Sequence, residues 1–222
     1  MKNFYIHFIR HGMTQSNLEG RYVGSTDVPV CKEGIEEIKE LLKNHTYPDV
    51  SHVYSSDLGR ALFTAEMIYP DVSITSVPDI REYHFGKFEN KTADELLGDP
   101  DYEDWLKTKL AGVPVDGECH ELFFERLWHG LDFIIKDMSR KGYTSAAVIS
   151  HGVVMMRWLE RFAMPRLPFF RWSAGNGKGY TARTSASMWM RDQIMEIVGV
   201  VPGGVENVEV SRGYENLTNL CE

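Results

Sequence analysis

The stretch that decides the fold is Phe4–Thr14, with the sequence FYIHFIRHGMT. Its first half is a short apolar run, rich in aromatic and β-branched residues and without helical period, so it predicts a buried β-strand. Arg10, His11 and Gly12 follow at the point where this strand should end. In open parallel sheets, ligands bind at the carboxyl ends of the strands. The stretch therefore predicts a cation, a nucleophilic imidazole and an exposed backbone side by side, which suits an anionic phosphoryl group.

Length and composition narrow the class of protein. The 222 residues suit one α/β domain, or a domain with a small lid, and suffice for a sizeable core. The net charge of −8 argues against nucleic acid or an anionic membrane as the main partner. The three cysteines are scattered and lack CxxC spacing, which predicts neither a disulfide framework nor a zinc site and favours a cytoplasmic protein. No apolar stretch of the sequence is long enough to span a bilayer.

Further strands and helices are expected around this first strand. Short apolar runs predict strands at 50–55, 74–77 and 145–150, the second of them at a sheet edge. Helical periods predict helices at 32–45, at 124–138 and after Gly152 as far as Phe162. On the first of these helices, the predicted buried positions are Ile35, Ile38, Leu41 and Leu42. The chain should then end in a hairpin with strands at 184–190 and 193–200.

Two more polar residues stand just beyond predicted strands. Ser56 or Asp57 is a good N-cap for a helix that follows the second strand, and Arg60 lies in the first turn of that helix. A helix N-terminus with an arginine beside it is a ready anion site. His151 follows the strand 145–150 as His11 follows the first strand. Two strand ends are therefore expected to bring two imidazoles to one edge of the sheet.

These residues lie in motifs that resemble those of the histidine phosphatase superfamily, in its phosphoglycerate-mutase-like branch. The motifs follow the family's order: RHGMT (10–14) with Asn17, GSTDVP (24–29), SSDLGRA (55–61), REYHFGKFENKT (81–92), DGEC (116–119) and SHG (150–152). The chain departs from the family pattern with Asp57 for proline, Phe88 for tryptophan, Asn90 for glycine and Cys119 for serine. Phe88 keeps an apolar anchor and asparagine tolerates positive φ, so neither of these two departures is expected to disturb the chemistry.

The resemblance implies a role for each matched site residue. His11 would be the nucleophile, and Glu82 the general acid that protonates the leaving oxygen and then activates water. His151 would belong to the catalytic set and would also bind phosphate. The full phosphate-binding set would be Arg10, Asn17, Arg60 and His151. No cofactor is implied, and no metal either, because His7 and His11, four residues apart on a strand, cannot converge on one ion.

The resemblance also implies the architecture. The fold class would be α/β, a three-layer sandwich with a mostly parallel central sheet and a small lid inserted after Glu82. The expected divisions are a domain at 1–202, a lid of two short helices at about 92–115 within it, and a C-terminal tail at 203–222. Trp105, Lys107 and Lys109 of the lid could meet the leaving group, although a packed tryptophan and solvated lysines are the more ordinary interpretation. Members of the family have a loop like 165–179 beside the pocket.

The function expected from these residues is a metal-independent phosphomonoesterase that acts through a phosphohistidine. One alternative is a cofactor-dependent phosphoglycerate mutase, although the neighbourhood of Glu82 and Val153–Val154 resemble the phosphatase members more. Another is a non-catalytic module that binds a phosphorylated ligand, against which His11, Glu82 and His151 argue. The predicted partner is a small phosphorylated substrate, with ribazole phosphate, sugar phosphates, phosphoglycerate and phosphoserine all open. The sequence carries no signal for an oligomeric state.

Overall fold

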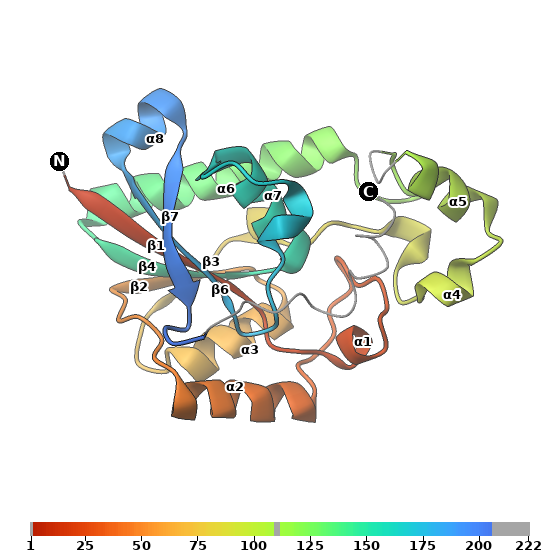
Figure 1. Cartoon of the computed structure of the whole chain (residues 1–222), viewed down its shortest axis with the longest axis horizontal. Helices are drawn as coiled ribbons and strands as arrows, with labels where there is room; N and C mark the ends of the chain where they lie inside the picture. The colour runs from red at the N-terminus through yellow and green to blue at the C-terminus, as the bar shows by residue number, and fades with distance from the viewer. Residues whose placement is uncertain (1, 109–111, 206–222) are drawn as a thin grey trace.

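The computed structural model describes residues 2–108 and 112–205. Within them, seven strands form one sheet in the order β3-β2-β4-β1-β6-β7-β5 (Figure 1). The strands are β1 (Asn3–Arg10), β2 (His52–Ser55), β3 (Ile74–Ser76), β4 (Ser145–Ser150), β5 (Ala163–Met164), β6 (Gly179–Ser185) and β7 (Met195–Val201). Parallel pairs join β3, β2, β4 and β1 in turn, whereas β6 runs antiparallel to both of its neighbours. The predicted mostly parallel sheet is confirmed, with β3 at its edge.

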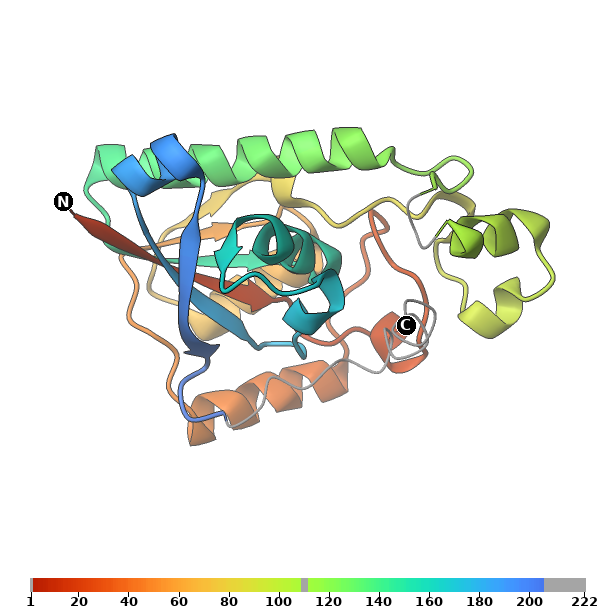
Figure 2. The same ribbon diagram turned by 45° about the horizontal axis from the view of Figure 1, so that its top comes forward.

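Helices cover both faces of this sheet (Figures 1 and 2). The α-helices are α1 (Gln15–Leu18), α2 (Lys32–Asn44), α3 (Gly59–Ile68), α4 (Ala93–Leu96), α5 (Pro100–Lys107), α6 (His120–Lys141), α7 (Gly152–Phe162) and α8 (Ala186–Asp192). Short 3₁₀ helices are η1 (Pro78–Ile80), η2 (Gly86–Phe88) and η3 (Phe169–Trp172). Phe4, Ile6 and Phe8 of β1 face a core shared with α6 and α7, whereas Ile9 faces a core shared with α2 and α3. This alternation along the strand produces the predicted three-layer α/β sandwich.

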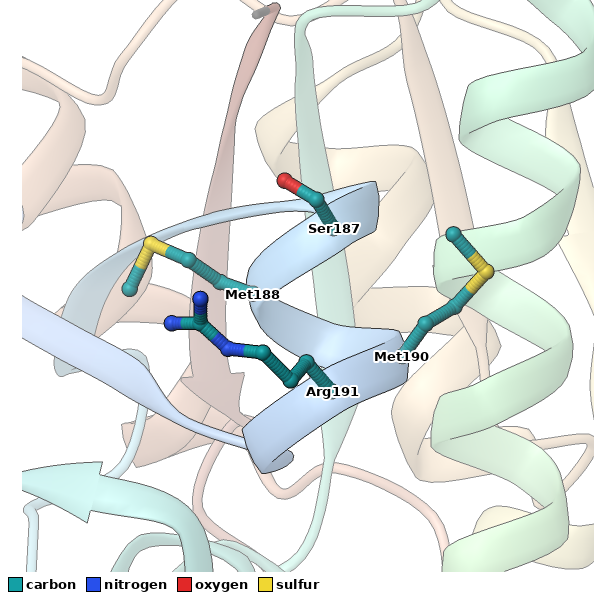
Figure 3. A pocket seen from close by; sticks show the side chains of 4 residues that line it. All are labelled: Ser187, Met188, Met190 and Arg191. Atoms are coloured by element: carbon teal, nitrogen blue, oxygen red, sulfur yellow. The ribbon is translucent and has the colours of Figure 1, made fainter.

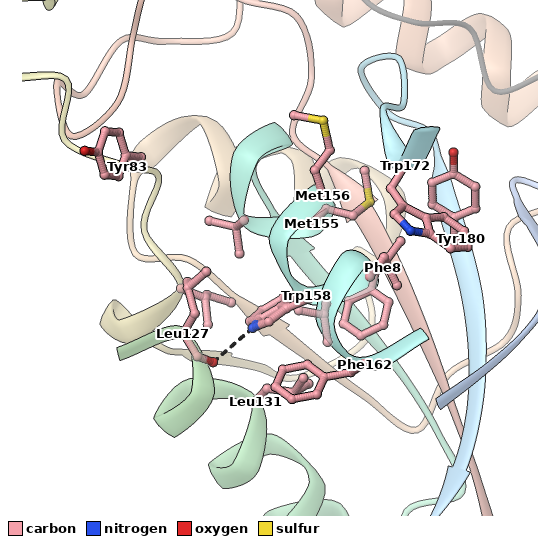
Figure 4. Packing of buried hydrophobic residues seen from close by; sticks show 14 of the residues in the cluster. Phe8, Tyr83, Leu127, Leu131, Met155, Met156, Trp158, Phe162, Trp172 and Tyr180 are labelled. Carbon is pink, nitrogen blue, oxygen red and sulfur yellow. Dashed lines mark hydrogen bonds between the residues drawn. The ribbon is translucent and has the colours of Figure 1, made fainter. Parts of the chain in front are cut away.

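The larger core fixes α7 against both the sheet and α6 (Figure 4). The ring of Trp158 lies 5.4 Å from that of Phe8 on β1, and its indole Nε1 donates to the carbonyl of Leu127 on α6 at 3.0 Å. Trp158 is fully buried, and a buried indole contributes both a large apolar area and a polar group that needs a partner. Because α7 is held in this way, His151, which directly precedes it, has a fixed position.

The prediction for Leu42 on α2 is wrong. Leu42 is 40% exposed, whereas Ile38 and Leu41 are 1% and 6% exposed. The buried stripe of α2 runs through Gly34, Ile38 and Leu41, and an added Cβ at Gly34 would lie 2.2 Å from the carbonyl oxygen of Met13. Because glycine lets α2 approach the loop after β1 so closely, the stripe turns away from Leu42.

The predicted terminal hairpin is also wrong in its boundaries. β6 and β7 do pair antiparallel, but residues 186–192 between them form the helix α8 instead of a strand. Ser185 caps this helix by accepting from the amide of Met188 at 3.2 Å. Trp189 is buried against α6, where its Nε1 donates to Asp132 at 3.0 Å. Capping and the burial of a large indole outweigh the alternating pattern of the sequence.

The outer face of α8 lies far from the predicted site. Ser187, Met188, Met190 and Arg191 line a cavity of about 420 Å³ there (Figure 3). Ser185, which leads into α8, pairs with Asn3 at the amino end of β1. The cavity is therefore at the opposite end of the sheet from the histidine that follows β1.

The inserted lid is present as two short helices, α4 and α5, which stand beyond the carboxyl end of β1 (Figures 1 and 2). Trp105 is 4% exposed and packs against the rings of Tyr22 and Phe88, at centroid distances of 5.8 and 5.3 Å. Lys107 is exposed and forms an ion pair with Asp104. Trp105 is therefore a packed tryptophan and Lys107 a solvated lysine, as the simpler interpretation expects. Lys109 lies outside the described residues.

The division of the chain into a domain at 1–202 and a tail at 203–222 stays a prediction, since only residues 203–205 of that tail are described. None of the described helices combines the length and the apolar character needed to cross a membrane.

Candidate active site

Two histidines meet at the carboxyl ends of neighbouring parallel strands. β1 and β4 pair with Arg10 opposite Ser150, so the next residues, His11 and His151, emerge side by side. Their ring centroids are 5.2 Å apart, and both side chains are buried. The convergence that the strand pattern predicted is therefore found.

The hydrogen bonding of His11 fixes which ring nitrogen carries a proton. Nδ1 lies 2.8 Å from the carbonyl oxygen of Gly12, which can only accept, so Nδ1 is the protonated nitrogen. Nε2 then keeps its lone pair. Burial, together with the charges of Arg60 and Arg10, holds the pKa of His11 well below its ordinary value. A neutral imidazole with a free lone pair is the form that can act as a nucleophile.

His151 is held by a residue that the sequence did not single out for this purpose. Its Nε2 is 2.8 Å from the hydroxyl of Ser56, which follows the neighbouring strand β2. Its Nδ1 is buried and has no hydrogen-bond partner among the described residues. Burial and the charge of Arg60, with a smaller contribution from His11, also lower the pKa of His151 well below its ordinary value. One ring nitrogen of His151 is thus available to an incoming ligand.

Two buried arginines supply positive charge to the same place. Arg10 and Arg60 are 4% and 1% exposed. Arg10 Nη1 donates to the carbonyl of Ala174 at 3.0 Å, in the loop 165–179. Arg60 donates to the carbonyls of Thr26 and Gly24 at 2.9 and 2.6 Å. These carbonyls orient both guanidinium groups in a chain whose net charge is −8, which forms a local cationic site for an anion.

Glu82 contacts the start of α7, and it is 4% exposed. Its Oε1 accepts from the amide of Tyr83 at 2.9 Å, and its Oε2 accepts from the amide of Val153 at 3.0 Å. Burial raises the pKa of Glu82, although the two backbone hydrogen bonds and the charges of Arg60 and Arg10 oppose this rise. A carboxyl group that stays protonated at higher pH than usual suits a general acid.

Asn17 reaches the site from the first turn of α1. Its Oδ1 accepts from the amide of Thr14 at 3.1 Å and from Asn176 Nδ2 at 3.4 Å. The amide oxygen of Asn17 therefore faces the protein, which leaves its Nδ2 as the donor for a ligand. Asn176 also donates to the carbonyl of His11 at 2.8 Å. Asn176 thus links the loop 165–179 to both residues, a role that its place in an irregular segment did not signal.

Thr64 on α3 is a second supporting residue that the sequence analysis left without a role. Its hydroxyl accepts from the amide of Gly12 at 2.8 Å and donates to the carbonyl of Arg60 at 2.7 Å. Gly12 packs tightly here, because an added Cβ would lie 2.6 Å from Ile38 Cδ1 and would require that side chain to shift. Thr64 therefore connects the loop of the predicted nucleophile to the backbone of a predicted phosphate-binding arginine.

The N-cap predicted for α3 is wrong. Neither Ser56 nor Asp57 caps this helix; instead, both carboxylate oxygens of Asp27 accept from the amide of Gly59, at 2.9 and 3.1 Å. Asp57 pairs with Arg81 through Nε at 2.6 Å. The cap comes from a loop distant in sequence, which local pattern rules do not consider.

The two remaining histidines near the motifs have structural partners. His7 lies 2.9 Å from the hydroxyl of Thr181 and 3.1 Å from that of Ser145, and burial lowers its pKa to about 4. His84 Nδ1 accepts from the amide of Gly86 at 3.2 Å. Among the described residues, no group of three or more His, Cys, Asp or Glu side chains is arranged to hold a metal ion.

Two known proteins are similar to this chain in sequence. The adenosylcobalamin/alpha-ribazole phosphatase of Escherichia coli (strain K12) is 28% identical over 162 residues, which cover 71% of this chain and 78% of the relative. A protein of Yersinia pestis (strain Pestoides F) with the name "Probable phosphoglycerate mutase GpmB" is 29% identical over 157 residues, or 68% and 70% of the two chains.

Solved structures share the fold. The crystal structure of the alpha-ribazole phosphatase from Shigella flexneri has a TM-score of 0.72 and 22% identity, and covers 92% of this chain and 100% of its own. A phosphoglycerate mutase from Bacillus anthracis has a TM-score of 0.68 at 22% identity, covering 89% and 92%. The model of the histidine phosphatase superfamily (branch 1) matches residues 6–189. The chain therefore belongs to branch 1 of the histidine phosphatase superfamily.

Proposed function

We propose that the protein is a cytoplasmic phosphatase that hydrolyses a phosphate monoester of a small metabolite through a phosphohistidine on His11. The observation that carries this proposal is that His11 and Glu82 are both buried, both feel the charges of Arg10 and Arg60, and are each in the state that the reaction needs. His11 presents an unprotonated Nε2, and Glu82 has a raised pKa that favours the acid form. A nucleophile and a general acid in these states are what cleavage of a phosphate ester requires.

In the first step, His11 Nε2 attacks phosphorus in line with the leaving oxygen, and the bond between phosphorus and that oxygen breaks. Glu82 donates its proton to the departing alkoxide, so that an alcohol leaves and Glu82 becomes a carboxylate. Arg10, Arg60 and Asn17 bind the nonbridging oxygens together with His151. These groups stabilise the charge that spreads over the transferred phosphoryl group.

In the second step, water replaces the alcohol. The Glu82 carboxylate takes a proton from this water, whose oxygen attacks phosphorus and breaks the bond to His11 Nε2. Inorganic phosphate leaves, and both residues return to their starting states. The cationic side chains perform the charge stabilisation that a metal ion supplies in other phosphatases.

A phosphoglycerate mutase is the second candidate, which the name of the Yersinia relative supports. It would use the same phosphohistidine but return the phosphoryl group to a hydroxyl of phosphoglycerate instead of to water. The similarity to an alpha-ribazole phosphatase makes alpha-ribazole phosphate one substrate to test, beside sugar phosphates, phosphoserine and phosphoglycerate.

The test is to incubate purified protein with these esters and with p-nitrophenyl phosphate, in the presence of excess EDTA. We expect net release of inorganic phosphate that EDTA does not reduce. Conversion of 3-phosphoglycerate to 2-phosphoglycerate without net phosphate release would favour the mutase instead. Tight binding of an ester with neither reaction would identify a binding module. Loss of activity in EDTA with recovery on adding Mg²⁺ or Zn²⁺ would contradict the proposed mechanism.

A further inference from the structure

One arginine outside the predicted site holds the backbone of the segment that ends at Glu82. Arg126 on α6 donates through Nη1 to the carbonyls of Asp79 and Arg81, at 2.9 and 2.7 Å, and through Nη2 to the carbonyl of Glu82 at 3.0 Å. The carboxylate of Glu118 accepts from Nε and Nη2 of the same guanidinium, at 2.6 and 2.7 Å. The bidentate ion pair with Glu118 fixes the plane of the guanidinium, and its remaining donor positions face the carbonyls.

The bond from Arg126 to the Glu82 carbonyl has a consequence for the side chain of Glu82. In a planar trans peptide the C=O and the following N–H point in opposite directions. The carbonyl of Glu82 is turned towards Arg126, so the amide of Tyr83, which belongs to the same peptide plane, is turned the other way. That amide donates to Glu82 Oε1 at 2.9 Å. Arg126 therefore sets the direction of a hydrogen bond that holds the carboxyl group.

Only the first part of this segment lies in a regular element, the short 3₁₀ helix η1, which ends at Ile80. Residues 81–85 lie between η1 and η2, outside any regular element. Ser150, at the end of β4, donates through its hydroxyl to the carbonyl of Ile80 at 2.9 Å. Ser150 and Arg126 together donate hydrogen bonds to the carbonyls of all four residues from 79 to 82. Side chains thus hold a segment that has no secondary structure of its own beyond Ile80.

We propose that Arg126, oriented by Glu118, is a positioning residue that holds the carboxyl group of Glu82 in place by fixing the orientation of the Glu82–Tyr83 peptide. This inference rests on the proposed function, because it assumes that Glu82 is the general acid. Lysine could not replace Arg126, since a single ammonium group cannot span a carboxylate and carbonyls on several residues.

The kinetic test compares Arg126→Met with the matched control Arg140→Met. Arg140 lies on the same helix and also forms an ion pair, with Asp137 at 2.6 Å, but it has no contact with residues 79–82. A misplaced general acid matters most for a poor leaving group. We expect Arg126→Met to lose on the order of 10²-fold in kcat/KM on an alkyl phosphate and less than about 10-fold on p-nitrophenyl phosphate. Arg140→Met should change neither value.

Two further measurements separate positioning from general damage to the fold. Arg126 and Glu118 line two surface cavities, of about 400 and about 780 Å³, so a small solute can reach the space that Arg126→Ala would open. Guanidinium chloride at low concentration should restore part of the alkyl phosphatase activity of Arg126→Ala. In Arg126→Met, the amide of Tyr83 should exchange its hydrogen faster than in the wild type. If Arg126→Met does not fold, Arg126→Lys is used, with the same selectivity expected.

An equal loss on both substrates, or unchanged exchange at Tyr83, would overturn the inference. Failure of the proposed function is recognised separately, because the wild type would then release no phosphate from any ester. Hydrogen exchange at Tyr83 is measured without substrate and does not depend on that result.

Discussion

In the proposed mechanism, the protonation of Glu82 decides the rate of the first step. The variant Glu82→Gln keeps the shape of the side chain but removes its proton. An alkyl phosphate needs that proton on its leaving oxygen, whereas p-nitrophenolate departs readily without it. We expect kcat/KM to fall on the order of 10²-fold or more on the alkyl ester and far less on p-nitrophenyl phosphate. On both esters kcat should also fall, because dephosphorylation would use Glu82 as a base in the proposed mechanism. Equal losses would show that Glu82 only positions the site.

In the proposed mechanism, the pH dependence of kcat/KM is set by the protonation states of Glu82 and His11. The acid form of Glu82 must be present, and burial raises its pKa, so kcat/KM on an alkyl phosphate should fall only as pH rises through that raised value. His11 must be neutral, and its lowered pKa places the acidic limb well below the ordinary histidine range. A pH profile of kcat/KM on the alkyl ester should therefore lose its alkaline limb in Glu82→Gln. An alkaline limb that persists in the variant would assign it to another group.

At the scale of elements, the cap of α3 gives a direct test of a contact that local sequence rules missed. Asp27→Ala removes the carboxylate that accepts from the amide of Gly59. Loss of an N-cap typically lowers the free energy of unfolding by about 1 kcal/mol. Asp57→Ala changes the position where the sequence predicted the cap, and it removes an ion pair with Arg81. Because the Arg81 side chain is 49% exposed, this variant should lower the free energy of unfolding by less. Urea unfolding of the two variants measures both values. A larger cost for Asp57→Ala would contradict the assignment of the cap.

The same contrast explains which elements could be predicted. β1 and β4 are buried on both faces and followed by polar residues, so the strand pattern in the sequence was strong and their ends were found. α8 was missed because residues 184–190 alternate like a strand, while the contact of Trp189 with Asp132 that favours a helix lies 57 positions away. The stripe of α2 was misplaced at Leu42 because the close approach of Gly34 to Met13 is a tertiary feature.

In the whole molecule, the candidate site is formed by residues from segments spread over most of the chain. Sequence reasoning could bring together His11 and His151, because strand ends in a parallel sheet share an edge. Arg10, Arg60 and Glu82 were predicted from motifs, whereas the electrostatic effect of the two arginines on His11 and on Glu82 appears only in the fold. Supporting residues escaped both kinds of reasoning. Arg126 and Asn176 act through backbone carbonyls remote in sequence, which leave no local pattern.

In the proposed mechanism His11 carries the phosphoryl group during turnover, so a covalent label should be detectable on it. Wild-type protein is mixed with a ³²P-labelled phosphate ester, quenched in alkali during turnover, and mapped by peptide. The account predicts a label on the peptide that contains His11, stable in alkali and lost in acid. His11→Ala should carry no label and should lose on the order of 10³-fold or more in turnover. An unlabelled wild-type protein that still turns over, or a His11→Ala variant that remains active, would contradict the account.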